Sequence, residues 1–177
     1  MVLAGRRVDA DGAEEPRFPL GNAASVQAQI REILASQDAR ILVCSAACGA
    51  DLLALEAAGQ LELRRRVILP FERLQFRKLS VVDRPGDWGP RFDRVMDEVE
   101  ASGDVVVMEY SSDDPDVYLT TSRVLFDEGI RIARENDLGL LVVVVWNGVS
   151  RGESDATDAF LRQAKALGLP AAEVNTL

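Results

Sequence analysis

The sequence contains no histidine and only two cysteines, Cys44 and Cys48, among its 177 residues. The absence of histidine excludes serine–histidine and cysteine–histidine catalysis in their usual forms. Two cysteines cannot supply the four ligands of a structural zinc site without further donors. We therefore expect buried free thiols of the kind found in a reducing compartment, no metal site and no bound cofactor.

Long apolar segments are also missing. The longest apolar run, residues 140–146, is far shorter than the roughly 20 residues of a membrane-spanning helix. The first residues lack the charged and then apolar pattern of a signal peptide. From these two features we expect a cytoplasmic protein with no membrane partner.

Basic residues are outnumbered, since 29 acidic and 20 basic residues give a net charge of −9. Such a charge repels phosphate backbones at long range, so we expect no double-stranded nucleic acid partner. The one dense basic cluster, residues 64–66, directly precedes an apolar run. We interpret it as a solvated edge of the next strand.

What the sequence does contain is a regular alternation of buried strands and amphipathic helices. Apolar runs predict strands over residues 40–44, 66–69, 104–108 and 140–146, with a weaker candidate at 2–4 and a plausible last strand at 171–174. Continuous apolar runs without polar alternation are typical of parallel strands covered on both faces. Apolar residues with helical spacing begin at Val26, Leu52, Phe92 and Ala156, and a further helix is expected over residues 121–135. Candidate N-caps are Asn22 for the first helix, Asp87 or Gly89 for the third and Ser154 or Asp155 for the last.

This alternation predicts an α/β fold: a single Rossmann-like domain over residues 1–177, with an open, mainly parallel sheet of about five to six strands and helices on both faces. Ligands of such sheets bind outside the carboxyl ends of the strands. Loops after strands are therefore the places to search for a site. The longest irregular stretches are residues 6–20, 70–89 and 109–119, and loops of that length are often functional.

Residues 44–51, Cys-Ser-Ala-Ala-Cys-Gly-Ala-Asp, give the strongest local signal. They read as a strand end, a turn of small residues and a helix start. Small side chains let backbone amides approach a ligand, and a helix N-terminus favours an anion. Asp51 could cap the helix or accept hydrogen bonds from a ribose. The segment matches neither the P-loop, which needs Gly-Lys-Ser/Thr, nor the three-glycine dinucleotide fingerprint.

With this loop, the sequence resembles the SLOG superfamily, which includes LOG-type cytokinin-activating nucleotide hydrolases and DNA-processing Smf proteins. The resembling segments, in chain order, are residues 5–9 and 16–19, 45–51, 67–71, 86–88 and 146–148. The resemblance implies a Rossmann-like fold, a site for a nucleotide-like small molecule and a bacterial ligand sensor. Family analogy, together with the general prevalence of symmetric dimers, leads us to expect a homodimer.

The sequence departs from this family at two places. Arg6 stands where relatives often carry histidine, and no Pro-Gly-Gly-x-Gly-Thr-x-x-Glu run is present. Glu128, in residues 126–129, is at best weakly similar to the glutamate of that run. If the chain were nevertheless a nucleotide N-glycosidase, it would need a carboxylate beside the ribose. The candidate carboxylates are Asp51, Asp87, Glu109 and Glu128.

The remaining ligand-binding candidates follow other strand ends. Arg6 and Arg7, after Gly5, could bind phosphate through paired hydrogen bonds or pair with nearby carboxylates. Phe71 could stack on a base or plug the core, and Tyr118 could belong to a lid. The full ligand-binding set that we predict is Gly5, Arg6, Arg7, Ser45, Ala46, Cys48, Gly49, Asp51, Pro70, Phe71 and Tyr118.

The sequence is compatible with three functions. The first is binding or sensing of a nucleotide or nucleotide-derived ligand at the carboxyl edge of the sheet, without catalysis. The second is hydrolysis of an N-glycosidic bond in a nucleotide, of the phosphoribohydrolase or NAD-cleaving type. The third is a non-catalytic interaction module with a degenerate pocket, because a fold alone does not fix a function.

Overall fold

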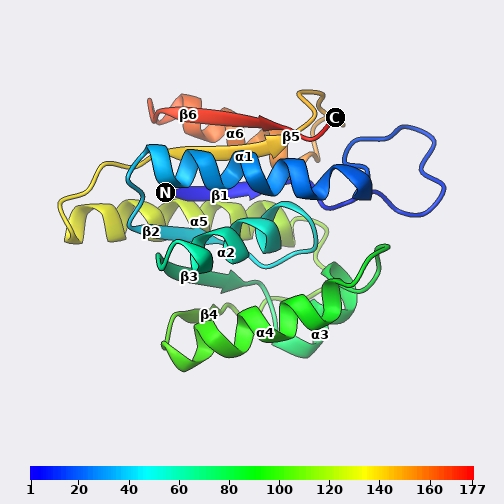
Figure 1. Cartoon of the computed structure of the whole chain (residues 1–177), viewed down its shortest axis with the longest axis horizontal. Helices are drawn as coiled ribbons and strands as arrows, with labels where there is room; N and C mark the ends of the chain where they lie inside the picture. Colours follow the sequence, from blue (N-terminus) through cyan, green and yellow to red (C-terminus); the bar gives the residue numbers. More distant parts are fainter.

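The computed structural model describes residues 1–177 and is built on one six-stranded sheet in the order β4-β3-β2-β1-β5-β6 (Figure 1). All five strand pairings are parallel. The strands are β1 (Val2–Gly5), β2 (Ile41–Cys44), β3 (Arg64–Leu69), β4 (Val105–Val107), β5 (Val142–Trp146) and β6 (Ala171–Asn175). The predicted single Rossmann-like α/β architecture is confirmed, including the two weaker strand candidates.

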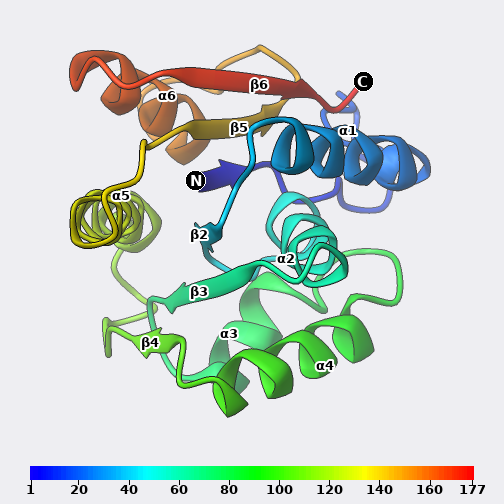
Figure 2. The same ribbon diagram turned by 60° about the vertical axis from the view of Figure 1, so that its left-hand side comes forward.

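Helices cover both faces of this sheet. They are α1 (Ala23–Ser36), α2 (Ala50–Gln60), α3 (Arg73–Ser80), α4 (Trp88–Ala101), α5 (Val117–Glu135) and α6 (Ala156–Ala166), preceded by a 3-10 turn at Leu20–Asn22. Figure 2 shows α1 to α4 on one side of the sheet and α5 and α6 on the other. None of these helices is long and apolar enough to cross a membrane.

The apolar pattern of β5 explains why the sheet needs both helical layers. All five of its side chains are buried. Val143 and Val145 belong to the core under α1, α2 and α4, whereas Val142 and Val144 belong to the core under α5 and α6. Because successive side chains of a strand point to opposite faces, a continuous valine run is stable only between two apolar layers.

The structure corrects three local expectations. Helix α3 lies inside the stretch 70–89, which we expected to be irregular, and α5 begins at Val117 rather than at residue 121. Asn22 makes no side-chain cap for α1; its amide donates instead to the carbonyl of Thr176. Asp155 does cap α6, because its carboxylate accepts the amides of Thr157 and Asp158.

The strand order places a crevice at one point of the sheet. Strands β2, β3 and β4 are added on one side of β1, while β5 and β6 lie on its other side. The direction of winding therefore reverses between β1 and β5. In open α/β sheets this reversal leaves a crevice at the carboxyl ends of the two strands, where ligands bind.

Candidate functional site

A pocket of about 440 Å³ opens at this crevice. Its walls are the segments that follow β1, β2 and β5, the end of α3, and the first turns of α2, α5 and α6. Small-molecule sites typically enclose roughly 300–1,000 Å³. The pocket is therefore large enough for a small organic ligand, and it lies where the fold predicts one.

The structure brings six of the eleven predicted ligand-binding residues to the pocket wall: Gly5, Arg6, Arg7, Ser45, Asp51 and Tyr118. The other five do not line it. Ala46, Cys48 and Phe71 are buried in the apolar core, where the Phe71 ring packs 5.9 Å from that of Phe76. The carbonyl of Pro70 accepts the amide of Tyr110. Of its two proposed roles, Phe71 therefore has the packing role.

Two glycines let the end of β1 approach the start of α2. A Cβ at Gly5 would lie 2.5 Å from the Cβ of Ala50, and one at Gly49 would lie 2.8 Å from the carbonyl of Arg6. Gly49 also has a φ of +93°, which side-chain-bearing residues rarely adopt. Gly49 is outside the pocket lining, and its role is to let the turn before α2 pack directly against the backbone of Arg6.

Arg6 is a buried structural cation. Its side chain is 3% exposed and forms two parallel hydrogen bonds of 2.7 Å with the two carboxylate oxygens of Asp155. The same guanidinium donates to the carbonyl of Val149 at 2.8 Å and lies 5.8 Å from the ring of Trp146. The expected carboxylate pairing of Arg6 exists, but in the interior rather than at the surface, and it ties β1 to the loop after β5.

Asp155 is correspondingly a tightly held anion. Burial alone would raise the pKa of its carboxyl, but the hydrogen bonds from Arg6 and from the backbone amide of Arg151 outweigh this and lower the pKa to about 2. Its two oxygens accept five donors in all. The Asp155 carboxylate is therefore already saturated with donors from within the chain.

Arg7 lies beside Arg6 in sequence but turns to the opposite wall. Its Nη1 donates to both oxygens of Asp83, at 2.9 and 2.8 Å, and to the carbonyl of Leu79 at 3.2 Å. Both members of this pair are about one-third exposed. An exposed pair of this kind contributes little stability, so Arg7 can exchange its partner at low cost.

Asp51 is the only predicted catalytic carboxylate that lines the pocket. One of its oxygens accepts the amide of Ala47 at 3.2 Å, so the side chain orders the preceding turn. Burial raises the pKa of this carboxyl to about 7, against the opposing effects of the Ala47 amide and the positive charge of Arg7. A carboxyl group with a pKa near 7 can exchange a proton at physiological pH.

The other predicted carboxylates lie outside the pocket lining. Glu128 pairs with Arg66 and Arg131 on the outer part of the α5 layer. Asp87 occupies the N-cap position of α4 without a side-chain cap hydrogen bond. Glu109 follows β4 with a φ of +55°. None of these three shares the cavity with Asp51.

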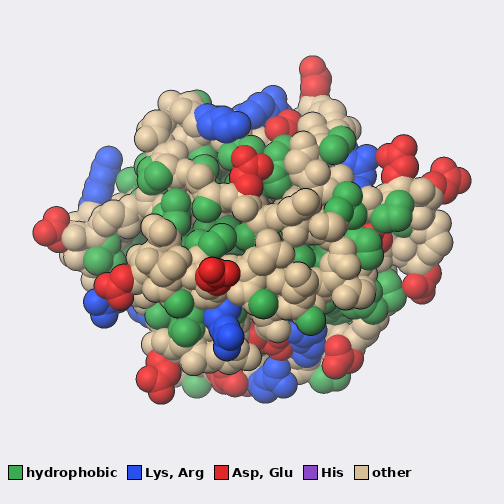
Figure 3. All heavy atoms as spheres, turned by 45° about the horizontal axis from the view of Figure 1, so that its top comes forward, with side chains coloured by type: hydrophobic (Ala, Val, Ile, Leu, Met, Phe, Trp, Pro, Cys, Tyr) green, Lys and Arg blue, Asp and Glu red, His purple; other side chains and the backbone are tan.

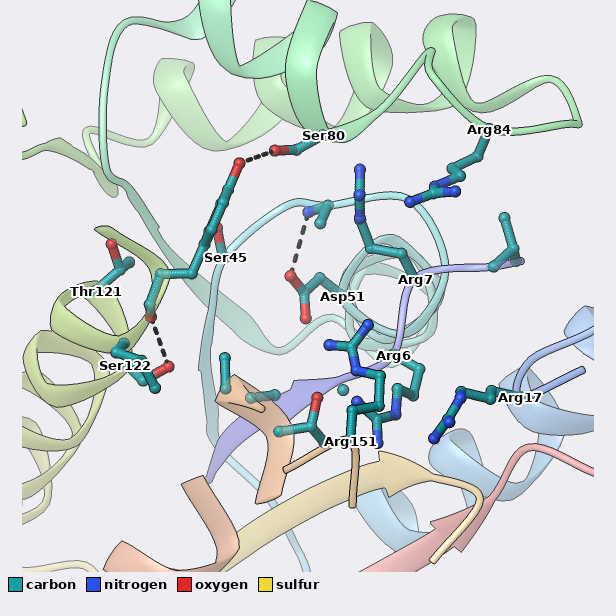
Figure 4. Close-up of a pocket in the computed structure, with 18 of the residues that line it drawn as sticks. Arg6, Arg7, Arg17, Ser45, Asp51, Ser80, Arg84, Thr121, Ser122 and Arg151 are labelled. Carbon is teal, nitrogen blue, oxygen red and sulfur yellow. Dashed lines mark hydrogen bonds between the residues drawn. The ribbon is translucent and has the colours of Figure 1, made fainter. Parts of the chain in front are cut away.

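Three arginines of the pocket were not predicted from the sequence. They are Arg17, Arg84 and Arg151. Figure 4 shows Arg84 and Arg151 reaching from opposite sides toward the space in front of Asp51. With Arg6 and Arg7, the lining holds five arginines and two aspartates, Asp9 and Asp51. Carboxylates just outside the lining pair with Arg6, Arg7 and Arg17, which leaves Arg84 and Arg151 as the least satisfied cations.

Hydroxyl groups complete the polar lining. The hydroxyls of Ser80 and Tyr118 lie 2.9 Å apart and join the end of α3 to the start of α5 across the pocket (Figure 4). Ser122 donates to the carbonyl of Tyr118. Ser45 lies on the loop after β2 and also faces the cavity. Such groups can orient a sugar or a base once charge has drawn in the ligand.

The remaining expectations about composition can be placed on the structure. Cys44 and Cys48 are both buried and free, as expected. Burial raises the pKa of the Cys48 thiol to about 12, which makes it unreactive.

The charged side chains of the surface are mixed. On the face shown in Figure 3, acidic and basic side chains are interspersed and form no large patch of one sign.

No protein-family model matches the sequence, and no curated protein matches it. Among solved structures, the chain is similar to the X-ray structure of DNA processing protein A (DprA) from Streptococcus pneumoniae, with 16% sequence identity and a TM-score of 0.38. The similarity covers 98% of this chain and 58% of that protein. Fold and pocket together define a Rossmann-like α/β protein with an arginine-lined cavity at its switch point.

Proposed function

We propose that this chain binds a nucleotide or a nucleotide-derived anion in the pocket between β1 and β5. The observation that carries this proposal is the set of five arginines lining one cavity of an acidic protein. Guanidinium groups are the side chains best suited to phosphate, because their planar fork donates two parallel hydrogen bonds. A ligand-sensing domain of the SLOG type is the class of protein that we propose.

Helix orientation supports an anionic ligand. The first turns of α2, α5 and α6 all contribute residues to the lining, namely Asp51, Tyr118 and Thr157. A helix carries about half a positive charge at its N-terminus. The first turn of α6 is already capped by the Asp155 carboxylate, so the ends of α2 and α5 are the ones that add to the field of the arginines and favour a negatively charged group in the cavity.

We expect a nucleotide to stabilise the protein in a thermal-shift screen of nucleoside monophosphates, cyclic nucleotides, NAD and ADP-ribose. A ligand present at 100 times its Kd adds about 2.7 kcal/mol to the free energy of unfolding. For a chain of this size that corresponds to a rise in Tm of roughly 5–10 °C. No stabilisation by any of these compounds at millimolar concentration would contradict the proposal.

The variant Arg151→Ala is expected to abolish most of this shift with little change in the Tm of the free protein, because its half-exposed guanidinium makes only a 3.7 Å contact with Asp155 and no hydrogen bond within the chain. Arg31→Ala is the matched control. Arg31 is exposed on α1, lies outside the lining and forms no ion pair. An equal loss of the shift in both variants would indicate a general effect of charge rather than a site.

A second candidate function, hydrolysis of a nucleotide N-glycosidic bond, is favoured by Asp51 alone. Its carboxyl lies in the pocket and has a pKa raised by burial to about 7, as a general acid or base requires. Free base released from a nucleoside monophosphate or NAD by the wild type, and not by Asp51→Asn, would establish catalysis. The open cavity gives no support to the third function, an interaction module with a filled pocket.

A further inference from the structure

The arginines of the pocket fall into two clusters on opposite sides of the end of β1. Arg6 turns toward Asp155 in the loop after β5, whereas Arg7 turns toward Asp83 in the loop between α3 and α4. Successive side chains of an extended segment point in opposite directions. The two walls of the cavity are therefore each built around one arginine–aspartate pair.

Each pair is accompanied by a second arginine that is not hydrogen-bonded. The Nε of Arg151 lies 3.7 Å from an Asp155 oxygen, and the Nε of Arg84 lies 3.5 Å from an Asp83 oxygen. In neither case does the guanidinium donate a hydrogen bond to the carboxylate, which already binds the first arginine. Arg151 and Arg84 both line the cavity, so each directs unused donors at its own side of the pocket.

The cluster on the β5 side also includes Arg17. Its Nη1 lies 3.4 Å from the carbonyl of Val149, the group that Arg6 binds at 2.8 Å. Its Nη2 also pairs with the exposed Glu15 at 3.2 Å, a contact that an incoming anion could replace. Three guanidinium groups are thus gathered around one short loop. Burial and the neighbouring charge of Arg6 lower the pKa of Arg151, as expected for a cation held among cations. The buried Nε of Arg6 also has no acceptor within the chain.

Unpaired donors on both walls indicate a ligand that meets both. The buried Nε of Arg84 has no acceptor, and leaving such a donor unsatisfied costs stability that an anion beside Arg84 and Arg7 would restore. Arg151 is half exposed, so its donors face solvent and are free to bind an anion together with Arg17. Asp51 stands beside Arg7 in the lining. With its pKa near 7 it can bind a hydroxyl or amine of the ligand that lies between two anionic groups.

Resting on the proposed function, we propose that the ligand carries two separate anionic groups, one bound by Arg151 with Arg17 and the other by Arg84 with Arg7. Its chemical class is a nucleotide with phosphates at two positions, or a dinucleotide. A nucleoside monophosphate would satisfy only one wall of the pocket. The two clusters would then make the affinity depend on the number and the spacing of the charges.

The test is calorimetric titration of the intact chain with AMP, adenosine 3′,5′-bisphosphate, NAD, inorganic phosphate and inorganic pyrophosphate. We expect at least one compound with two anionic groups to bind at least tenfold more tightly than AMP. Arg151→Ala and Arg84→Ala should each weaken that compound at least tenfold. Arg151→Lys and Arg84→Lys should lose less, because lysine retains the charge without the planar fork. Arg31→Ala should change nothing.

The outcomes separate this inference from the proposed function. If AMP binds as tightly as every compound with two anionic groups, and only one of the two alanine variants weakens it, the pocket binds nucleotides and the two-anion inference is wrong. If no nucleotide binds but pyrophosphate does, and both alanine variants abolish its binding, the two clusters are right and the nucleotide is wrong. If none of the five compounds binds, the two-anion inference is wrong; if the thermal-shift screen also shows no stabilisation, the proposed function is wrong as well.

Discussion

Replacing Asp155 with alanine is expected to lower the free energy of unfolding by about 4 kcal/mol, because removing one partner of a buried ion pair typically costs 3–5 kcal/mol. The substitution leaves the Arg6 guanidinium, whose side chain is 3% exposed, without its anion. It also leaves the first amides of α6 without the cap that they now have. Urea denaturation of the two proteins at pH 7 measures the difference.

The pH dependence of this contribution follows from the lowered pKa of Asp155. The carboxyl has a pKa of about 2 in the folded chain and 3.8 as its ordinary value. The pair therefore stabilises the fold fully above pH 4 and is lost as the pH falls through about 2. Asp127→Ala is the matched control, since Asp127 is exposed on α5 and has no ion-pair partner. A cost below 1 kcal/mol for Asp155→Ala would contradict this account.

Asp51→Asn is expected to raise the free energy of unfolding at pH 8, by up to about 4 kcal/mol, and to change it little near pH 4. The folded chain holds a proton on Asp51 up to a pKa of about 7, against 3.8 ordinarily. Between these values only the folded state carries the proton, so wild-type stability falls as the pH rises from 4 to 7. Asparagine retains an acceptor for the Ala47 amide without the buried charge.

Urea denaturation at pH 4 and at pH 8 distinguishes this effect from a general one. Asp127→Asn, at an exposed position, should shift stability by less than about 0.5 kcal/mol at both values. An Asp51→Asn variant that is equally stabilised, or equally destabilised, at both pH values would show that Asp51 does not titrate near 7. A ligand that binds the Asp51 carboxylate would also bind the variant more weakly.

The sheet could be predicted from sequence because most inner strands are continuous apolar runs between two helical layers; in β3 only Val67–Leu69 are apolar, and the strand begins at Arg64, two residues before the predicted start. Strand β5 is the clearest case, since all five of its side chains are buried. Helix α3 gave no such signal: of its eight residues only Phe76 and Ser80 are buried, and Glu72 supplies no side-chain cap. An exposed helix with one apolar anchor cannot be distinguished from a loop by periodicity.

Sequence predicted only those residues of the site that directly follow a strand in the chain. The loop of small residues ending at Asp51 and the arginines after Gly5 each follow a strand end directly, so the switch-point rule found them. Arg84 and Arg151 lie in loops and reach the cavity through tertiary folding alone. Arg84 falls in the long stretch 70–89 and Arg151 follows β5, so a search of loops for arginine would have found both.

The sequence could not show which carboxylate each arginine of the site binds. Arg6 and Asp155 are 149 residues apart in the chain, yet they form a bidentate pair. No local pattern indicates that the first arginine after β1 faces inward while Arg7 faces the loop after α3. The sequence left phosphate binding and carboxylate pairing open for both residues, and the structure assigns a carboxylate partner to each.

Native mass spectrometry of the freshly purified chain tests the central claim most directly. We predict an added mass that matches a phosphate-containing compound, present under native conditions and absent after acid denaturation, or one that appears when a nucleotide is added at micromolar concentration. The Arg84→Ala, Arg151→Ala double variant should lack it, while Arg31→Ala should retain it. A spectrum that shows only the bare chain, both as purified and with every nucleotide added, would contradict the claim that this pocket binds a nucleotide.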